Sequence, residues 1–412
     1  MTQPDDDQRG HDHVDLAGEP HRRVSATSGH LITEESATYS RWQRLWRRVH
    51  ATDRDALLVW LASRVSIVVV AGTTGWLLLG PDQVVRPFLD LWVQWDFYHY
   101  RGIAEFGYGG EPTGVPNEAF FPGFPALLWL GDLVGLPHVL AGLLISLVAG
   151  AVAAVALARL GDLEGGPGTG RLAVVAWVFA PPAVFLAAPY TESLFLSLAV
   201  PAWLAARQGR WAPAGVLAAL ACTVRVSGVF LVAALVVEWL TSRHRRGFGG
   251  LAWLFAPALP LLAWTGYLRW LTGDWLAWLS AQAQEWNRTF TWPWDSFANT
   301  WGAAFGGTVS VDFVWMFRAE IAAVLIGVAL TTALLLLRRW GEATWVGLQV
   351  AAFATSYWYF SVPRAMLLWW PLWIGLAVVA VRQRWVLWAY LSVSVPLMAI
   401  WAATYLTSRW AG

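Results

Sequence analysis

Residues 137–160 read PHVLAGLLISLVAGAVAAVALARL, an apolar stretch long enough to decide the class of fold. A helix of about 20 apolar residues crosses the hydrocarbon core of a bilayer, so this stretch predicts a membrane-spanning helix. Two regions fit the rule poorly, because 121–136 is short and rich in proline whereas 211–240 is long and interrupted by the sequence RVSG. Further spans are predicted at 56–79, 171–188, 190–207, 250–271, 319–337, 343–361, 365–381 and 385–407.

The composition agrees with a polytopic membrane protein and excludes an ordinary soluble domain. The chain has 412 residues, of which 57% are hydrophobic and 13% charged, and it contains 31 Trp, far from average usage. The net charge of +1 gives no indication of a nucleic-acid partner, and none is expected. Because Cys222 is the single cysteine, an internal disulfide is excluded. We expect an all-α bundle of transmembrane helices whose surrounding partner is the lipid bilayer.

Arginines predict the orientation of the bundle, because basic residues collect on the cytoplasmic side of a membrane. Short arginine-bearing loops recur between the predicted spans. If all of them are cytoplasmic, 121–160 crosses once, 211–240 goes out and back, and the chain makes about eleven spans. The arginines concerned are Arg41, Arg44, Arg47, Arg48, Arg54, Arg159, Arg171, Arg207, Arg210, Arg243, Arg245, Arg246, Arg338, Arg339, Arg382 and Arg384.

The N-terminal tail, residues 1–50, lacks periodic apolar positions and is rich in Asp, His, Ser and Gly. It is predicted to be a disordered cytoplasmic tail, and it resembles no secretory signal. His11, Asp12 and His13 are more simply solvated linker residues than metal ligands. Residues 51–412 are predicted to form the transmembrane domain.

The predicted outer face carries the loop 80–120, the turn at Pro189–Ser193 and the break around Arg225. A second outer loop, 272–318, is rich in tryptophan. Tryptophan is enriched where a membrane meets water, so this loop is expected to lie in the interface. The outer side therefore brings together the polar segments of the chain.

The first outer loop contains WDFYHYRGIAEFGY at residues 95–108. Read as a helix over 96–106, this sequence places Asp96, His99, Tyr100 and Ile103 on one face. An acid and an imidazole would then meet at a membrane surface, where an unpaired carboxylate is costly. Two interpretations of Asp96 follow: it caps the short helix, or it performs chemistry.

Two further candidates lie near apolar runs. Glu192, in PYTES, is a membrane-embedded acid and therefore a functional candidate; alternatively, Thr191 caps the next helix and Glu192 lies in its favourable first turn. Arg225, in ACTVRVSGVF, has a planar guanidinium that suits phosphate; alternatively, it forms a structural ion pair with Glu192. Arg64 is expected to snorkel or to pair within the bundle, and Arg364 to end a helix after Pro363. No Gly-rich phosphate loop, Ser-His-Asp arrangement or Cys/His metal spacing is present.

These segments together resemble the PIG-V family, which comprises the second mannosyltransferase of glycosylphosphatidylinositol synthesis and its bacterial relatives. Residues 95–108 are similar to its W-D-x-x-H-[FY]-x-x-I-A-x-x-G-Y signature, and AFFPGFP follows at 119–125. PYTESLF is similar to a later Y-[ST]-E-S-L-F segment and TVRVSG to a T-R-x-x-G segment. TVRVSG departs from the common Arg-Ser-Asn-Gly form at Val226 and Ser227, and the rest of the chain agrees only in hydropathy.

The resemblance implies an integral-membrane glycosyltransferase of the GT-C class, which takes sugar from a polyprenyl-phosphate carrier at the outer face. Asp96 would be the catalytic base of an inverting transfer of mannose, and Arg225 and His99 would neutralise the leaving phosphate. Glu192 would orient the acceptor or a water, or bind a divalent metal ion. The substrate-binding residues that the resemblance implies are Trp95, His99, Glu105, Tyr108, Phe121, Pro122, Tyr190, Glu192 and Arg225.

The expected enzyme lies in the cell membrane, uses polyprenyl-phosphate mannose as donor and modifies a glycolipid or lipid-linked glycan of the cell envelope. One alternative is a transporter or flippase of lipid-linked substrates. A transporter favours ionisable groups near the midplane and repeat symmetry, whereas the acids here cluster in outer loops. A closer alternative keeps the GT-C chemistry and uses a different polyprenyl-phosphate sugar.

Overall fold

The computed structural model describes residues 50–78, 87–109, 116–242 and 247–412, which all belong to one compact unit, Arg48–Gly412. These residues form helices and no strand, which confirms the all-α prediction for this part of the chain. The predicted tail up to residue 49 lies outside the described residues, and so do Arg243, Arg245, Arg246 and the parts 79–86 and 110–115 of the first outer loop.

Long apolar helices make the chain a multi-pass membrane protein. Within the described ranges, 5 helical segments are long and apolar enough to cross a membrane. One of them, Gly249–Thr272, joins the end of α10 (Gly247–Trp253) to α11 (Ala258–Thr272). The others are α2 (Ala51–Leu77), α5 (His138–Gly165), α14 (Val311–Leu336) and α18 (Arg384–Leu406).

The remaining bundle helices are shorter than the predicted spans, so the count of about eleven is not confirmed. The apolar run at 171–188, for example, ends as a helix at Val178 because the following prolines, Pro181 and Pro182, lack the N–H that a helix needs. The run 211–240 does turn back on itself, as two short helices that meet at 223–226. These shorter helices are α6 (Thr169–Val178), α7 (Thr191–Arg207), α8 (Trp211–Cys222), α9 (Ser227–Thr241), α15 (Trp340–Ala354) and α17 (Trp370–Arg382).

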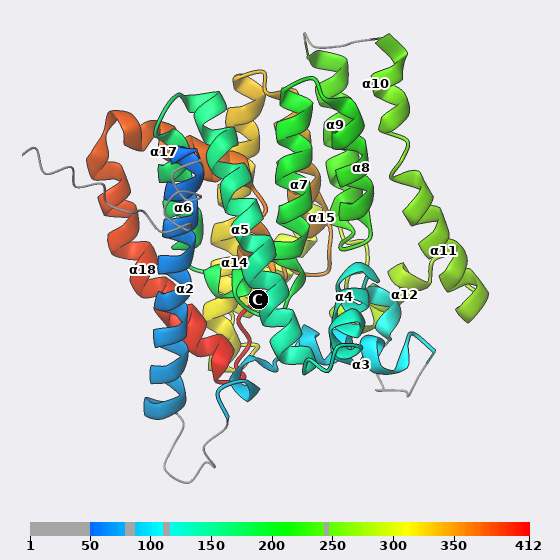
Figure 1. Cartoon of the computed structure of the whole chain (residues 1–412). Coiled ribbons are helices and arrows are strands. Elements are labelled where there is room, and N and C mark those ends of the chain that lie inside the picture. Colours follow the sequence, from blue (N-terminus) through cyan, green and yellow to red (C-terminus); the bar gives the residue numbers. More distant parts are fainter. Residues whose placement is uncertain (1–49, 79–86, 110–115, 243–246) are drawn as a thin grey trace, which may run out of the picture. The chain divides into compact units, whose positions relative to one another are not determined.

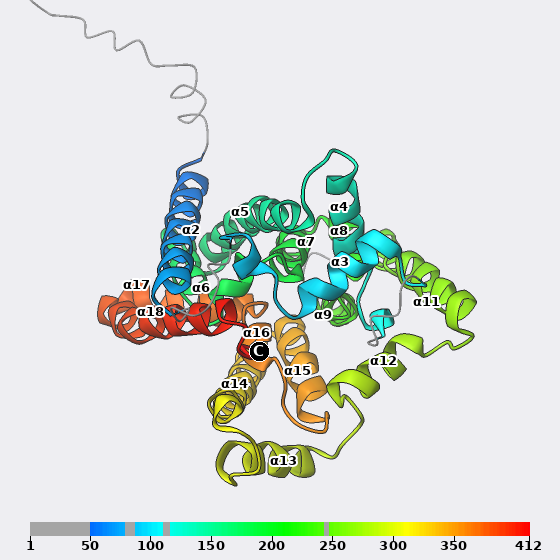
Figure 2. The same cartoon turned by 90° about the horizontal axis from the view of Figure 1, so that it is seen from below.

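Short helices gather at one end of the bundle, the lower end in Figure 1, where α3 and α4 lie beside α12. Seen from below in Figure 2, α3 and α4 lie in front of α8 and α9, which stand above them in Figure 1. The segment that was predicted to form the first outer loop thus carries short helices, as expected. The short elements are η1 (Asp90–Trp92), α3 (Asp96–Phe106), η2 (Asn117–Ala119), α4 (Gly123–Asp132), η3 (Ala183–Leu186), α12 (Ala277–Trp286), α13 (Pro293–Phe305) and α16 (Val362–Met366).

Small residues bring the bundle helices close together, as is usual in membranes. A Cβ added at Gly150 of α5 would lie 2.1 Å from the ring of Trp60, so the indole fits against bare backbone. The Trp60 ring also stacks on Trp177 at 5.8 Å. Arg64, one turn further along α2, lies over Trp60 at 4.0 Å and donates to Ser63 Oγ. Arg64 therefore packs inside the bundle, but among the described residues it contacts Trp60 and Ser63 and forms none of the ion pairs that were expected as one of its two placements.

Candidate functional site

Asp96 is the first residue of α3, and the helix has the limits that the sequence predicted. The residue before it, Trp95, is 44% exposed and has a φ of 46°, which is rare for a residue with a side chain. The segment that leads to Trp95 is anchored, because the buried Tyr190 hydroxyl donates to the carbonyl of Gln94 at 2.9 Å. Strain of this kind persists only where the surroundings impose it, and it is common at functional sites.

The carboxylate of Asp96 is used for an ion pair and not for a helix cap. No side-chain cap hydrogen bond is present at the start of α3, so the capping interpretation is wrong. Instead, Arg364 Nη1 donates to Asp96 Oδ2 at 2.6 Å. The Asp96 side chain remains 21% exposed, whereas Arg364 is 7% exposed. The acid is therefore held firmly by a buried cation yet can be reached from outside.

The pKa of Asp96 reflects these surroundings. Burial raises the pKa of the carboxyl, but the charge and the hydrogen bond of Arg364, together with the charges of His99 and Arg225, outweigh burial and hold the pKa below its ordinary value. Asp96 is consequently a carboxylate at neutral pH.

Glu192 connects Arg364 to Arg225. It is fully buried at the second position of α7, and its Oε1 accepts hydrogen bonds from Arg364 Nε and, at 2.5 Å, from Arg225 Nη1. Arg225 Nη1 also donates to the hydroxyl of Thr191 at 2.7 Å. Thr191 thus does not cap α7, whereas the expected ion pair between Arg225 and Glu192 is confirmed. We call the chain Asp96, Arg364, Glu192 and Arg225 the ionic chain.

Arg364 is the member of the ionic chain whose ion pairs the sequence did not predict, because it was expected only to end a helix. It lies on α16, whose first N–H groups, those of Ser361 and Val362, donate to the carboxylate of Glu320 at 2.7 and 2.8 Å. Its guanidinium lies over the ring of Tyr190 at 4.6 Å. Glu320 could have drawn attention to this region, because it is an acid inside the predicted span 319–337 and an acid within a membrane span normally has a functional or structural role. No local pattern, however, connects residue 364 with residue 96.

His99 does not make the direct contact with Asp96 that helical spacing suggested. Its Nδ1 lies 3.0 Å from Asn117 Oδ1, and its ring stacks on Phe120 with centroids 4.6 Å apart. Trp286 of α12 approaches the same ring at 6.0 Å. The imidazole therefore ties α3 to η2 and α12, and it acts on Asp96 through its charge.

Glu105 lies apart from the ionic chain. Its carboxylate pairs with Arg101 at 3.7 Å and with His138, at the start of α5, at 3.5 Å. It faces a different neighbour because nine residues along a helix turn a side chain to about the opposite face. The structure thus does not bring together all the acids of the first outer loop.

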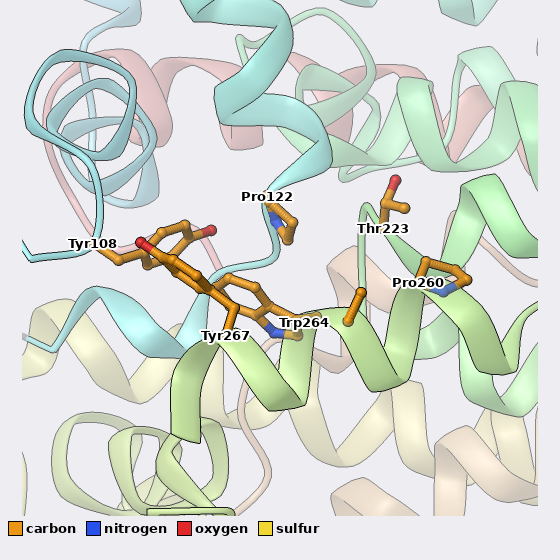
Figure 3. Close-up of a pocket in the computed structure, with 7 residues that line it drawn as sticks. Tyr108, Pro122, Thr223, Pro260, Trp264 and Tyr267 are labelled. Atoms are coloured by element: carbon orange, nitrogen blue, oxygen red, sulfur yellow. The ribbon is translucent and has the colours of Figure 1, made fainter. Parts of the chain in front are cut away.

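An apolar groove of about 450 Å³ adjoins the site (Figure 3). Tyr108 closes one end, where its hydroxyl donates to the carbonyl of Phe120 at 2.8 Å and its ring lies 4.6 Å from that of Trp264. Phe121 packs beneath Trp264, with ring centroids 6.1 Å apart. The groove is lined by Tyr108, Pro122, Thr223, Pro260, Ala263, Trp264 and Tyr267.

The residues present do not fit a metal site at Glu192. Two guanidiniums already bind its carboxylate, and their positive charge opposes the approach of a cation. Among the described residues, no group of three or more His, Cys, Asp or Glu side chains is placed to hold a metal ion.

Comparisons with known proteins relate part of the chain to mannosyltransferases. A stretch of 192 residues, 44% of the chain, is 36% identical to GPI alpha-1,6-mannosyltransferase 2 of Mus musculus and covers 37% of that protein. The Cricetulus griseus protein of the same name is 36% identical over 191 residues, also 44% of this chain and 37% of that protein. The Homo sapiens protein is 37% identical over 166 residues, which are 38% of this chain and 33% of that protein. The matched stretches thus span little more than a third of these curated relatives.

No protein-family model matches the chain. Among solved structures, the chain is similar to the crystal structure of ArnT from Cupriavidus metallidurans bound to undecaprenyl phosphate, with a TM-score of 0.45 and 14% identity over 84% of this chain and 75% of that one. This similarity is too low to establish a shared fold. The sequence similarity to part of the mannosyltransferases is therefore the firmer of the two relationships.

Proposed function

We propose that the chain is an integral-membrane inverting glycosyltransferase of the GT-C class that transfers mannose from polyprenyl-phosphate mannose. The acceptor is a glycolipid or lipid-linked glycan at the outer face of the membrane. The observation that carries the proposal is Asp96, a partly exposed carboxylate that Arg364 holds at 2.6 Å at the edge of the bundle. The partial similarity to curated mannosyltransferases supports the choice of sugar.

The proposed reaction is a single displacement. The acceptor hydroxyl oxygen forms a bond to the anomeric carbon, while the bond from that carbon to the phosphate oxygen breaks and leaves its electron pair on the phosphate. The proton of the hydroxyl passes to Asp96. The carboxylate also stabilises the positive charge that develops on the sugar ring.

Neighbouring residues have positioning and binding roles in this scheme. Glu192 is fully buried, so it holds the guanidiniums of Arg225 and Arg364 in place and does not itself meet a large acceptor. Arg225 is 22% exposed and has donors to spare for phosphate. The apolar groove suits the hydrocarbon chain of the donor lipid, because Thr223 in its wall lies two residues before Arg225. Trp95, which directly precedes Asp96 and is 44% exposed, is available to contact sugar.

The test is the substitution Asp96→Asn, which keeps the shape of the side chain and removes its basicity. Membranes that contain this variant should transfer no mannose from radiolabelled polyprenyl-phosphate mannose, with expression and insertion unchanged. Asp132→Asn, the same change at an exposed position on the neighbouring helix α4, should leave transfer unchanged. Retained transfer by the Asp96 variant refutes the assignment of the base.

The same membranes identify the donor sugar. Parallel assays with polyprenyl-phosphate glucose and polyprenyl-phosphate arabinose distinguish mannose from the other sugars, and mass spectrometry of glycolipids that accumulate in a deletion strain identifies the acceptor. If lipid-linked sugar crosses the membrane intact and no glycosidic bond forms, the transporter alternative is correct.

A further inference from the structure

Arg288 is an arginine close to the ionic chain that has no acid of its own. It lies in the segment between α12 and α13 and is half-buried. Within the described part of the chain, its guanidinium makes no hydrogen bond or ion pair, and it lies over the ring of Phe353 at 5.6 Å. A charged group taken partly out of water normally finds a partner. Among the described residues, Arg288 is therefore a cation without an ion-pair partner.

The backbone holds Arg288 in place. Asn287 has a φ of 49°, and its carbonyl accepts a hydrogen bond from the N–H of Tyr357. On the other side of Arg288, the N–H of Thr291 donates to the carbonyl of Thr355 at 2.9 Å. The segment thus runs along residues 355–357, which lead to α16 and Arg364. These backbone hydrogen bonds therefore fix the position of the Arg288 backbone relative to residues 355–357.

The charges of the site are unbalanced at Arg288. The ionic chain contains two carboxylates and two guanidiniums, so its charges cancel. Burial lowers the pKa of Arg288 to about 10, and the positive charges of Arg225 and Arg364 contribute in the same direction, against the raising effects of Asp96 and Glu320. The guanidinium therefore lies among charges of both signs, and because it makes no ion pair with a described residue it can accept an anion as its partner.

We infer that Arg288, together with the spare donors of Arg225, binds the phosphate of the lipid donor and of the polyprenyl phosphate released from it. The inference rests on the proposed function for the identity of the lipid. A phosphodiester carries one negative charge, so it can pair with the guanidinium of Arg288, which makes no ion pair with a described residue. When the bond to the sugar breaks, the electron pair that stays on phosphate oxygen adds negative charge, so Arg288 also favours departure of the leaving group. The Trp-rich segment thereby contributes a binding residue to a site whose other members come from the bundle and the first outer loop.

Binding of a short donor analogue tests the inference without any need for turnover. Farnesyl phosphate, farnesol and inorganic phosphate are titrated against the full chain in detergent. The unsubstituted chain should bind farnesyl phosphate more tightly than farnesol, and Arg288→Gln should weaken binding of farnesyl phosphate about 10- to 100-fold, the usual loss for a hydrogen bond to a charged group. Binding of farnesol should not change. Arg288→Lys keeps the positive charge but loses the planar guanidinium, so its affinity for farnesyl phosphate should lie between that of the unsubstituted chain and that of Arg288→Gln.

The matched control is Arg318→Gln. Arg318 also lies over a phenylalanine ring, that of Phe305 at 5.0 Å, but it is exposed and donates to the carbonyl of Ala304. Its variant should bind farnesyl phosphate as the unsubstituted chain does. Unchanged binding in Arg288→Gln, or equal losses in the two variants, overturns the inference. Tight binding of inorganic phosphate alone that depends on Arg288 reassigns the site to a free anion. If farnesyl phosphate binds through Arg288 but no sugar is transferred, only the proposed reaction fails.

Discussion

At the scale of the residue, the site depends on how one arginine controls one acid. Burial alone would make Asp96 reluctant to ionise, and the ion pair with Arg364 reverses that effect. The ion pair keeps Asp96 ionised but also makes it a weaker base, because a carboxylate with a lowered pKa holds a proton less firmly. The arrangement suits the proposed reaction, in which the carboxylate both stabilises positive charge on the sugar and receives a proton late in the displacement.

Substitution of Arg364 should therefore move the pH dependence of the reaction. In Arg364→Gln, the raising effect of burial on Asp96 remains while the lowering effect of the guanidinium disappears. The acid limb of kcat/KM, which reports the base of the free enzyme, should shift to higher pH by about 1–3 units. Arg364→Lys should keep the limb near its original position with a lower kcat. A loss of activity with an unmoved acid limb would mean that Arg364 has only a structural role.

The sequence predicted the acid of this pair and not its cation, for a physical reason. Helical spacing is a local property, so the limits of α3 could be predicted from residues 95–108. The contact of Asp96 with Arg364 joins residues 268 positions apart, and a spacing rule says nothing about such a pair. Arg288 was not predicted as a site residue either, because its segment is distant in sequence from residues 96 and 225 and was noted for its tryptophans rather than for its charge.

At the scale of the element, close backbone contacts explain why two of the segments that resemble the PIG-V family contain a glycine. A Cβ at Gly123, in AFFPGFP, would lie 2.8 Å from the carbonyl oxygen of Thr223, to which the Gly123 N–H donates at 2.7 Å. A Cβ at Gly228, in TVRVSG, would lie 2.6 Å from the Cα of Cys222. The first glycine lets α4 touch the turn between α8 and α9, and the second lets that turn close. Both contacts place Arg225.

The contact at Gly123 predicts a measurable loss of stability. Gly123→Ala forces α4 away from the turn at Thr223, and overpacking of this kind costs about 1–3 kcal/mol. The midpoint of thermal unfolding in detergent should fall, and the affinity for farnesyl phosphate should fall with it because Arg225 moves. Gly375→Ala, in α17, adds a Cβ with no atom within 4 Å and should not destabilise the protein. Equal midpoints for the two variants would contradict this account of AFFPGFP.

The number of spans was harder to predict than the helices near the site. Hydropathy depends on composition, so it joins apolar segments even where prolines interrupt the backbone, as Pro181 and Pro182 do after α6. The turn between α8 and α9 was predicted because Arg225 breaks the apolar run. The prediction of helix limits from apolar runs is therefore poor where prolines interrupt the run and better where a charged residue interrupts it.

At the scale of the whole molecule, buried charges occupy both ends of the bundle. Glu192 lies in the first turn of α7 and belongs to the ionic chain, whereas Arg207 ends the same helix and belongs to a second network. Arg207 pairs with Glu238 at 3.2 Å and with Glu164 at 3.7 Å, and Glu164 also pairs with Arg339. The second network joins α5, α7 and α9 to the start of α15. Its end of the bundle is also the end where arginines were predicted to face the cytoplasm.

The orientation of these two ends is the last prediction, and the single cysteine makes it easy to measure. Cys222 is 1% exposed, so the unsubstituted chain should react little with a membrane-impermeant maleimide. Ser310→Cys introduces an exposed thiol at the start of α14, and Gln383→Cys introduces one between Arg382 and Arg384. In Figure 1, α14 begins toward the lower end of the bundle, whereas α17 and α18 meet toward its upper end.

In intact cells, Ser310→Cys should be labelled and Gln383→Cys should be labelled only after permeabilisation, because the arginines beside residue 383 retain that loop in the cytoplasm. Since α3 lies at the same end as the start of α14, this result supports an outer location for Asp96. The reverse pattern would place Asp96 and Arg288 in the cytoplasm, where the donor would have to present its sugar from the inner leaflet.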